Sequence, residues 1–195
     1  MSNKLVANKL IVLSAPSGTG KSTLANLLLK NHSDKIKLSI SHTTRVPRGR
    51  ERNGVEYFFT DRATFEKMIS ENEFLEHAQV FNTHYYGTSK SFVEKVLSTG
   101  LNVLFDIDVQ GAFQLKSKYG DRCLSIFIHP PSMEILEERL RNRKTDKPED
   151  IKKRLETAKV EIKESEKFDH HIVNKDLNVA FQELESLLKK AGCFG

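Results

Sequence analysis

The chain has 195 residues, a length that supports one hydrophobic core with small appended lobes. Its hydrophobic content is 38% and no apolar run is long enough for a transmembrane helix, so we expect no membrane contact. The formal net charge of +5 suits polyanionic ligands, but it does not distinguish nucleic acid from nucleotides. The basic stretches at 44–52 and 138–144 lack the aromatic-rich pattern of an RNA-binding sheet, so no nucleic-acid partner is expected.

The compartment is predicted from the N-terminus and from the cysteines. The first ten residues lack the apolar core and the cleavage site of a secretory signal. Two cysteines, Cys123 and Cys193, are too few for a disulfide framework and have no metal-type spacing. We therefore expect a cytoplasmic protein in which Cys123 is a small buried apolar residue.

The first predicted elements are a buried strand over residues 9–14, a glycine-rich turn and a helix over residues 22–30. The turn resembles a phosphate-binding loop, because glycine, lysine and serine follow one another at the spacing of that motif. One position departs from the motif, since Ala15 replaces its first glycine. Pro16 biases Ala15 towards extended backbone with negative φ, where a methyl group costs little.

This loop predicts a binding site for a nucleoside triphosphate. Backbone N–H groups and the N-terminus of the following helix would surround the β-phosphate. Lys21 would reach the β- and γ-phosphates, and the Ser22 hydroxyl could ligate Mg²⁺. The residues assigned to ATP here are Ala15, Pro16, Ser17, Gly18, Thr19, Gly20, Lys21, Ser22 and Thr23.

Residues 37–96 interrupt the alternation of strands and helices. One helix is predicted over residues 61–70, with Asp61 as its N-cap. Short strands are predicted around it at 37–41, 56–60, 77–81 and 84–88. We interpret this segment as an inserted lobe with its own small mixed sheet.

The remaining chain returns to alternating elements. Further core strands are predicted at 101–108, 123–128 and 170–174, and helices at 91–97, 109–118, 151–162 and 177–188. Such alternation indicates an α/β fold with a parallel sheet covered by helices on both faces. The segment 131–157 is helical and strongly charged, and we interpret it as a lid.

Two acids end the strand predicted at 101–108. Asp106 and Asp108 alternate with Ile107, so they share one face of an extended chain and could hold Mg²⁺ directly or through water. Acids at a strand end are also common as helix caps or turn formers. Both interpretations stay open at this point.

The stretch SHTTRVPRGRERNGVEYFF narrows the class of nucleotide-binding protein. It closely resembles guanylate kinases through Thr43, Thr44, Arg45, Arg48, Glu51, Gly54 and Tyr57. The resemblance continues in FLEHA, YYGTS, FDIDVQG, PPS and IVN, and it covers the chain from residue 9 to about residue 188. Members with alanine at the first loop position are familiar, so Ala15 is no departure from this family.

The resemblance implies a P-loop NTPase-type parallel core with an inserted mixed α/β GMP-binding lobe and a helical lid. It implies phosphoryl transfer from MgATP to GMP, giving ADP and GDP in purine nucleotide metabolism, with dGMP as a related substrate. The implied domains are a core ATP-binding domain of residues 1–38, 97–130 and 158–195, a GMP-binding lobe of residues 39–96 and a lid of residues 131–157. Nothing in the sequence decides between a monomer and a homo-oligomer.

The resemblance also implies roles for individual residues. The GMP site would comprise Ser41, Arg45, Arg48, Glu51, Tyr57, Glu76, Tyr86, Gly87, Thr88, Asp106 and Asp108. Asn174 would lie near the adenine of ATP, and Mg²⁺ would be held by Ser22 and Asp106, directly or through water. The catalytic set would be Lys21, Arg45 and the lid-side arginines Arg139, Arg143 and Arg154, which face the ATP phosphates.

Glu76 has a chemical reason to be in such a site. A carboxylate accepts two hydrogen bonds, which matches the adjacent N1–H and N2 amino donors of guanine. Without the resemblance, Glu76 in SENEFLEHA would be taken for an ordinary surface acid. The acceptor phosphate needs no general base, because its second pKa is near 6 and it is mostly dianionic at neutral pH.

Three alternatives remain beside this interpretation. A scaffold-type domain of the same family would bind partners without catalysis, and a related kinase would use another nucleoside monophosphate. A nucleic-acid-binding role rests on net charge alone. Two positions depart from the family pattern: Lys144 replaces a common glycine in the lid, and Lys175 replaces a common acid near the adenine side.

Overall fold

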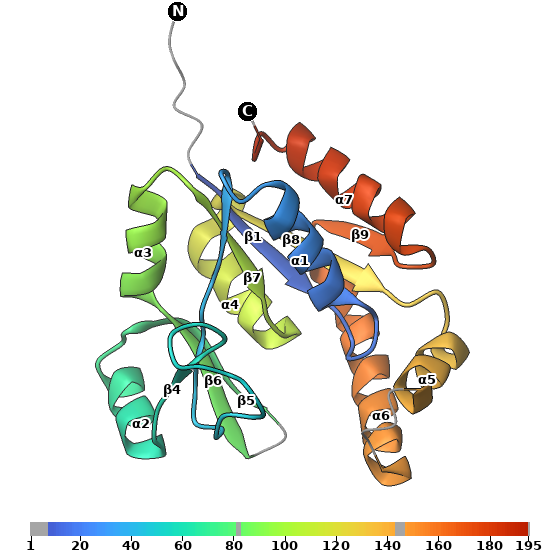
Figure 1. The fold of residues 1–195 in the computed structure, drawn as a ribbon, viewed down its shortest axis with the longest axis horizontal. Coiled ribbons are helices and arrows are strands. Elements are labelled where there is room, and N and C mark those ends of the chain that lie inside the picture. Colours follow the sequence, from blue (N-terminus) through green and yellow to red (C-terminus); the bar gives the residue numbers. More distant parts are fainter. Residues whose placement is uncertain (1–7, 81–82, 143–146, 195) are drawn as a thin grey trace, which may run out of the picture.

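The computed structural model describes residues 8–80, 83–142 and 147–194, and it contains two sheets (Figure 1). The larger sheet has five strands in the order β2-β7-β1-β8-β9, and all neighbouring strands are parallel. Its strands are β1 (Leu10–Ser14), β2 (Ile36–Leu38), β7 (Asn102–Asp106), β8 (Cys123–His129) and β9 (His170–Val173). The predicted α/β class with a parallel core is confirmed.

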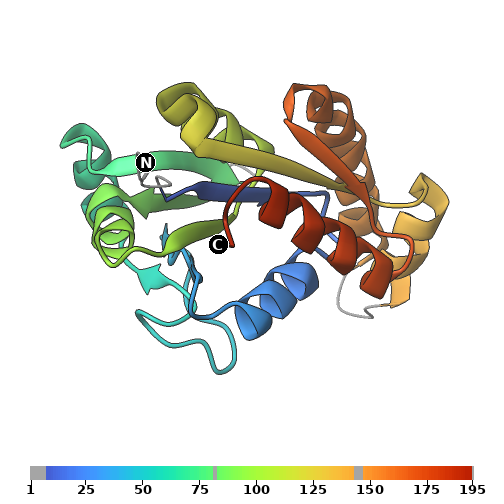
Figure 2. The same cartoon turned by 90° about the horizontal axis from the view of Figure 1, so that it is seen from above.

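Helices cover both faces of this sheet, as Figure 2 shows. On one face α1 (Lys21–Asn31) and α7 (Leu177–Lys190) pack against Ile11 and Leu13 of β1. On the other face α3 (Lys90–Ser98) and α4 (Val109–Tyr119) pack against Leu10 and Val12. Successive residues of a strand point to opposite faces, so the uninterrupted apolar sequence of β1 is what a sheet covered on both sides requires.

The strand predicted at 37–41 in the lobe is wrong. Residues Ile36–Leu38 instead form β2, the edge strand of the core sheet, paired in parallel with β7. Ile36 is buried in the core cluster beneath α1, and Leu38 packs against that cluster. Hydrophobic burial in the core therefore holds this short strand, and the chain enters the lobe only after it.

The inserted lobe contains the smaller sheet, with strand order β4-β3-β6-β5. Its strands are β3 (His42–Thr43), β4 (Phe58–Phe59), β5 (Phe74–Val80) and β6 (His84–Ser89). β3 and β4 are parallel, whereas β6 runs antiparallel to β3 and to β5, so the predicted mixed sheet is confirmed. Helix α2 (Arg62–Ser70) begins after Asp61, whose carboxylate accepts a hydrogen bond from Thr64 N at 2.8 Å as the cap prediction required.

Two helices form the region predicted as a lid. They are α5 (Met133–Asn142) and α6 (Pro148–Glu164), and they pack together through Leu136, Leu140, Ile151 and Ala158. Residues 143–146 between them, including Arg143 and Lys144, lie outside the described residues. Helix α6 continues past residue 157, so it connects the lid region to the core without a break; the division into core, lobe and lid stays a prediction.

Short 3₁₀ turns complete the fold at η1 (Gly120–Arg122) and η2 (Ser165–Lys167). Cys123 is buried at the start of β8, as predicted, and burial raises the pKa of its thiol to about 12. None of the described helices combines the length and the apolar sequence that crossing a bilayer requires. In Figure 1 the lobe and the helices α5 and α6 lie on either side of the carboxyl end of β1, where ligands bind in open parallel sheets.

Candidate active site

The glycine-rich turn connects β1 to α1 at the carboxyl edge of the core sheet. Gly18 and Gly20 have φ values of +95° and +98°, which favour glycine. Among the described residues only Asn72 combines a side chain with positive φ, so Ala15 has the negative φ expected before Pro16. The predicted loop geometry is therefore confirmed, and the alanine is accommodated without strain.

Lys21 and Ser22 begin helix α1 and both contact the end of β7. The Lys21 Nζ lies 2.7 Å from Asp106 Oδ1 and donates a hydrogen bond to the Ile107 carbonyl at 2.8 Å. The Ser22 hydroxyl donates to Asp106 Oδ2 at 2.8 Å. One carboxylate thus holds both side chains at the mouth of the loop.

These oxygen atoms fit a magnesium ion. Mg²⁺ prefers hydroxyl and carboxylate oxygens, and beside phosphates it needs only one or two protein ligands. The Ser22 hydroxyl and the Asp106 carboxylate supply that set within one hydrogen bond of each other. The described residues contain no cluster of three metal-ligating side chains, so they form no closed metal site. Ser22 and Asp106 would instead hold an ion whose other ligands are phosphate oxygens and water.

Asp106 and Asp108 have different local roles. Asp108 is the N-cap of α4, and its Oδ1 accepts a hydrogen bond from Gly111 N at 2.8 Å. The helix-cap interpretation therefore holds for Asp108, although its side chain still lines the same cavities as Lys21. Asp106 caps no helix and faces the phosphate loop instead.

Two of the predicted lid-side arginines contact the phosphate loop directly. Arg154, from α6, donates to Ser17 Oγ at 2.7 Å. Arg139, from α5, donates to the Thr19 carbonyl at 3.4 Å and to the Asn174 carbonyl at 3.0 Å. Arg143 lies outside the described residues, so its contact with the ATP phosphates stays a prediction.

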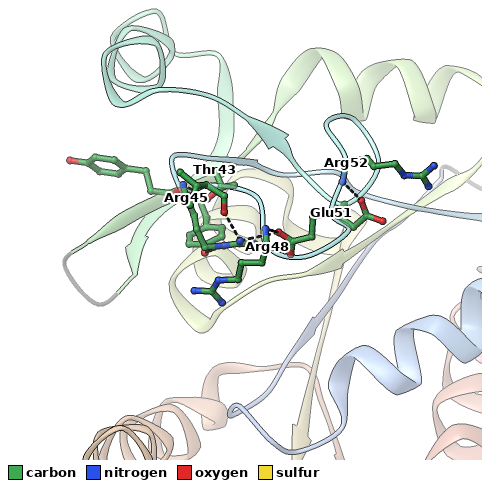
Figure 3. A network of polar contacts seen from close by, with 9 residues as sticks. Thr43, Arg45, Arg48, Glu51 and Arg52 are labelled. Atoms are coloured by element: carbon green, nitrogen blue, oxygen red, sulfur yellow. Dashed lines mark hydrogen bonds and ion pairs between the residues drawn. The ribbon is translucent and has the colours of Figure 1, made fainter. Parts of the chain in front are cut away.

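A second cationic centre lies in the lobe, in the loop between β3 and β4 (Figure 3). Arg45 is 6% exposed, and Glu51 accepts from it with both carboxylate oxygens at 2.9 Å. The Arg45 Nε also donates to the Tyr86 hydroxyl at 3.2 Å. The guanidinium carbon lies 5.3 Å from the centre of the Tyr57 ring.

These contacts fix the Arg45 guanidinium without using all of its donors. Nη1 donates to Glu51 and to the Val46 carbonyl, Nε donates to Tyr86, and Nη2 donates once to Glu51. A guanidinium has five N–H donors, so these contacts leave one N–H of Nη2 unused. The side chain of Arg48 is exposed, while its backbone N–H donates to Glu51 at 2.8 Å. Glu51 therefore positions this cationic centre.

The third part of the site is a buried carboxylate. Glu76 in β5 is 3% exposed, and its Oε1 accepts from the Thr88 hydroxyl at 2.6 Å. The Ser41 hydroxyl lies 3.2 Å from the same Thr88 oxygen. Gly87 is packed beside these residues, where a Cβ would lie 3.0 Å from the Glu76 carbonyl oxygen. The interpretation of Glu76 as a surface acid is therefore wrong.

One cavity contacts Lys21 of the loop, the buried Glu76 and the two tyrosines beside Arg45. Its volume is about 220 Å³, and its wall contains Lys21, Ser41, Tyr57, Glu76, Tyr86, Asp106 and Asp108. Arg48 and Arg154 both line a neighbouring cavity between the lobe and α6. Seven of the predicted site residues thus line one space, and the phosphate loop lines the adjoining cavity together with Arg154.

Burial also controls the charge of Glu76. Desolvation raises the pKa of this carboxyl to about 7, and nearby Asp108 acts in the same direction against the Thr88 hydrogen bond. Protonation removes one acceptor position, so a ligand that donates two N–H groups binds the ionised form. We expect the KM for such a ligand to rise roughly tenfold as the pH falls from about 7.5 to about 6.

Steady-state kinetics with GMP as the ligand over that pH range would measure this effect. The same measurement on Glu76→Gln serves as the control, because the GMP phosphate titrates in this range and the variant keeps that titration but loses the carboxyl. An equal proportional rise of the KM for GMP in the variant would assign the effect to phosphate protonation instead.

Sequence reasoning missed Gly111, which lies in the first turn of α4. A Cβ at this position would lie 2.7 Å from Glu76 Oε2. We therefore expect Gly111→Ala to raise the KM for GMP by roughly tenfold or more, even though alanine favours a helix over glycine. The matched control is Gln110→Ala in the same turn, because the Gln110 side chain is exposed. Ala112→Gly is less suitable, because Ala112 is buried. Equal KM values for Gly111→Ala and wild type would contradict the expectation.

A second missed residue is Glu161 on α6. It lines the cavity in front of the phosphate loop together with Lys21 and Asp108, and burial raises the pKa of its carboxyl to about 7. It follows Arg154 by seven residues, which is two helical turns and therefore the same helix face. That spacing is the signal by which the sequence could have revealed it.

A phosphate loop whose lysine shares a cavity with a buried carboxylate and with the tyrosines that contact a buried arginine defines a P-loop kinase that acts on a small phosphorylated acceptor. The family model described as "Guanylate kinase" matches residues 7–191. The chain therefore belongs to the guanylate kinase family.

Individual relatives agree with the family match. The chain is 48% identical over 180 residues to a guanylate kinase of Rickettsia bellii, covering 92% of each chain. It is 48% identical over 187 residues to a guanylate kinase of Bacteroides thetaiotaomicron, covering 96% of this chain and 91% of the relative. The crystal structure of guanylate kinase from Anaplasma phagocytophilum is similar with a TM-score of 0.76 at 36% identity, covering 95% and 86% of the two chains.

Proposed function

We propose that this chain transfers the γ-phosphoryl group of MgATP to GMP, giving ADP and GDP. The observation that carries the proposal is the cavity in which Glu76, the only described buried glutamate, shares a wall with Lys21 of the phosphate loop. A guanine at one end and a triphosphate at the other would meet in this space. dGMP carries the same base and phosphate, so we expect it to be accepted as well.

On the ATP side the loop acts through its backbone. Its N–H groups and the N-terminus of α1 would bind the β-phosphate, and Lys21 would exchange Asp106 for the phosphate oxygens. Arg154 and Arg139 already contact the loop at Ser17 and Thr19, so small movements would bring them to the phosphates. Bound Mg²⁺, held by Ser22 and Asp106, would neutralise charge on the transferred group.

On the GMP side two kinds of recognition are separated in space. Glu76 would accept hydrogen bonds from the guanine N1–H and N2 amino group, and adenine would place a bare N1 lone pair there. The remaining Arg45 donor, Arg48 and the hydroxyls of Tyr57 and Tyr86 would hold the phosphate. Because Glu51 and Tyr86 fix Arg45 before the ligand arrives, binding does not have to order that side chain.

Catalysis would consist of alignment and charge neutralisation. The attacking GMP phosphate is mostly dianionic near neutral pH, so no side chain has to remove a proton. Lys21, Arg45 and the arginines of α5 and α6 surround the place where charge spreads over the transferred group. We also propose a cytoplasmic location, consistent with two buried cysteines that are both free thiols.

A coupled assay of ADP release with GMP, dGMP, AMP, CMP, UMP and dTMP tests the proposal. We expect turnover with GMP and dGMP, and rates lower by orders of magnitude with the others. Preferential turnover of another monophosphate would assign a different acceptor. Absence of turnover, together with no thermal protection by ATP, would favour a scaffold-type domain, since a ligand stabilises a protein only when it binds the folded form.

A further inference from the structure

Asn174, which the resemblance places near the adenine, contacts the phosphate loop directly. It follows β9 and is 5% exposed. Its side-chain Nδ2 donates a hydrogen bond to the Thr19 carbonyl at 2.7 Å. Its backbone N–H donates to the His129 carbonyl at 2.9 Å, which ties the residue to the end of β8. Asn174 therefore contacts the back of the phosphate loop from a rigid part of the core sheet.

Asn174 does not line the cavity in front of the loop. The described wall of that cavity contains Gly18, Gly20 and Lys21. In a trans peptide the C=O and N–H groups point in opposite directions. Anchoring the Thr19 oxygen on Asn174 therefore turns the Gly20 N–H of the same peptide unit away from Asn174, towards the phosphate side.

This peptide unit needs an anchor because glycine follows it. Gly20 has a φ of +98°, and a glycine can also adopt the negative φ that would result if the peptide turned over. The approach is also close, since a Cβ on Gly20 would lie 2.5 Å from the Asn174 Nδ2. Glycine thus permits both the contact and the alternative orientation, and the hydrogen bond selects one of them.

The Thr19 carbonyl has few other partners. Thr19 is fully buried, so water cannot replace a missing donor there. Arg139 is the second donor, at the longer distance of 3.4 Å, and it also donates to the Asn174 carbonyl at 3.0 Å. When Arg139 turns towards a phosphate, Asn174 remains as the donor that holds the peptide.

We propose that Asn174 is a positioning residue for phosphate binding, which orients the Gly20 N–H through the Thr19 carbonyl and does not recognise the adenine through its side chain. The proposal rests on the proposed ATP site. It predicts that Asn174 contributes to the affinity for any nucleoside triphosphate, whatever its base. A contact with the adenine amino group would instead favour ATP over inosine triphosphate, which lacks that group.

Equilibrium titration of Asn174→Ala with MgATP, Mg-inosine triphosphate and GMP distinguishes these roles. We expect roughly tenfold weaker binding of both triphosphates, the effect of one lost hydrogen bond, and unchanged GMP binding. Asn178→Ala, an exposed change at the start of α7, is the matched control and should bind all three as wild type does. A loss for ATP alone would overturn the proposal in favour of base recognition.

Unchanged binding of both triphosphates, with only a lower temperature of unfolding, would also overturn it and leave a structural role. If Asn174→Ala does not fold, NMR of the wild-type protein decides the question. The Gly20 amide and the Asn174 side-chain amide should shift equally on adding ADP or inosine diphosphate, whereas base-dependent shifts of the Asn174 amide would contradict the proposal. GMP phosphorylation by the wild type tests the function separately, so its failure is not confused with failure of this inference.

Discussion

Replacing Lys21 by methionine is expected to lower kcat for GDP formation by at least about 10²–10³-fold, with GMP binding retained. Methionine keeps most of the apolar stem but removes the only charge that the helix N-terminus places at the loop. In the structure that charge already lies 2.7 Å from Asp106, so it is held at the mouth of the loop before ATP binds. Its loss leaves charge on the transferred phosphoryl group without its nearest cation.

The measurement is single-turnover formation of GDP at saturating ATP and GMP, with GMP affinity measured by titration. Lys30→Met in the last turn of the same helix is the control, because Lys30 is exposed and far from the loop along α1. A kcat within a few-fold of wild type for Lys21→Met would remove Lys21 from the catalytic set.

Glu76→Gln is expected to lower kcat/KM for GMP by about 10²–10³-fold while the affinity for ATP stays the same. The amide keeps one acceptor but presents an NH₂ group to a guanine donor, and buried polar groups left unpaired are strongly unfavourable. Thr88 would still have an oxygen to donate to, so the fold should tolerate the change.

Kinetics with GMP and titration with ATP measure the two quantities. The control is Glu73→Gln, three residues earlier and exposed, which makes the same chemical change outside the cavity. Equal losses for GMP and ATP would refute base recognition by Glu76, and an unchanged kcat/KM would place guanine elsewhere.

Local patterns predicted the elements whose signals are strong. The apolar run before the phosphate loop became β1, and the Asp61 cap begins α2 as expected. The strand at Ile36–Leu38 was assigned to the wrong sheet, because three residues carry too little pattern to show which sheet they join. Its place follows from long-range pairing with β7, which periodicity does not contain.

Some site residues were predicted from motif spacing, and others only from the family resemblance. Motif spacing alone indicated the phosphate loop, whereas the resemblance was needed to single out Glu76 among several nearby acids. Neither source showed that Glu51 fixes Arg45, or that Gly111 leaves room for the Glu76 carboxylate. The first relation depends on side-chain directions and the second on the space that a Cβ on Gly111 would fill. Both are known only once the chain is folded.

Asn174 also shows that a motif does not contain the partner of a side chain. The short motif that carries it implied a place near the adenine, and it contained no sign that the amide donates to a backbone carbonyl of the phosphate loop. A motif identifies a residue type at a position, and the partner of its side chain is set by the packing of β9 beside the loop.

The central claim is that phosphate passes directly between two nucleotides inside one cavity. Its most direct test follows the γ-phosphate of labelled ATP during turnover with Mg²⁺ and GMP. We expect the label to be recovered in the β-phosphate of GDP, in an amount equal to the ADP formed. Recovery of the label as inorganic phosphate, with GMP unchanged, would contradict it.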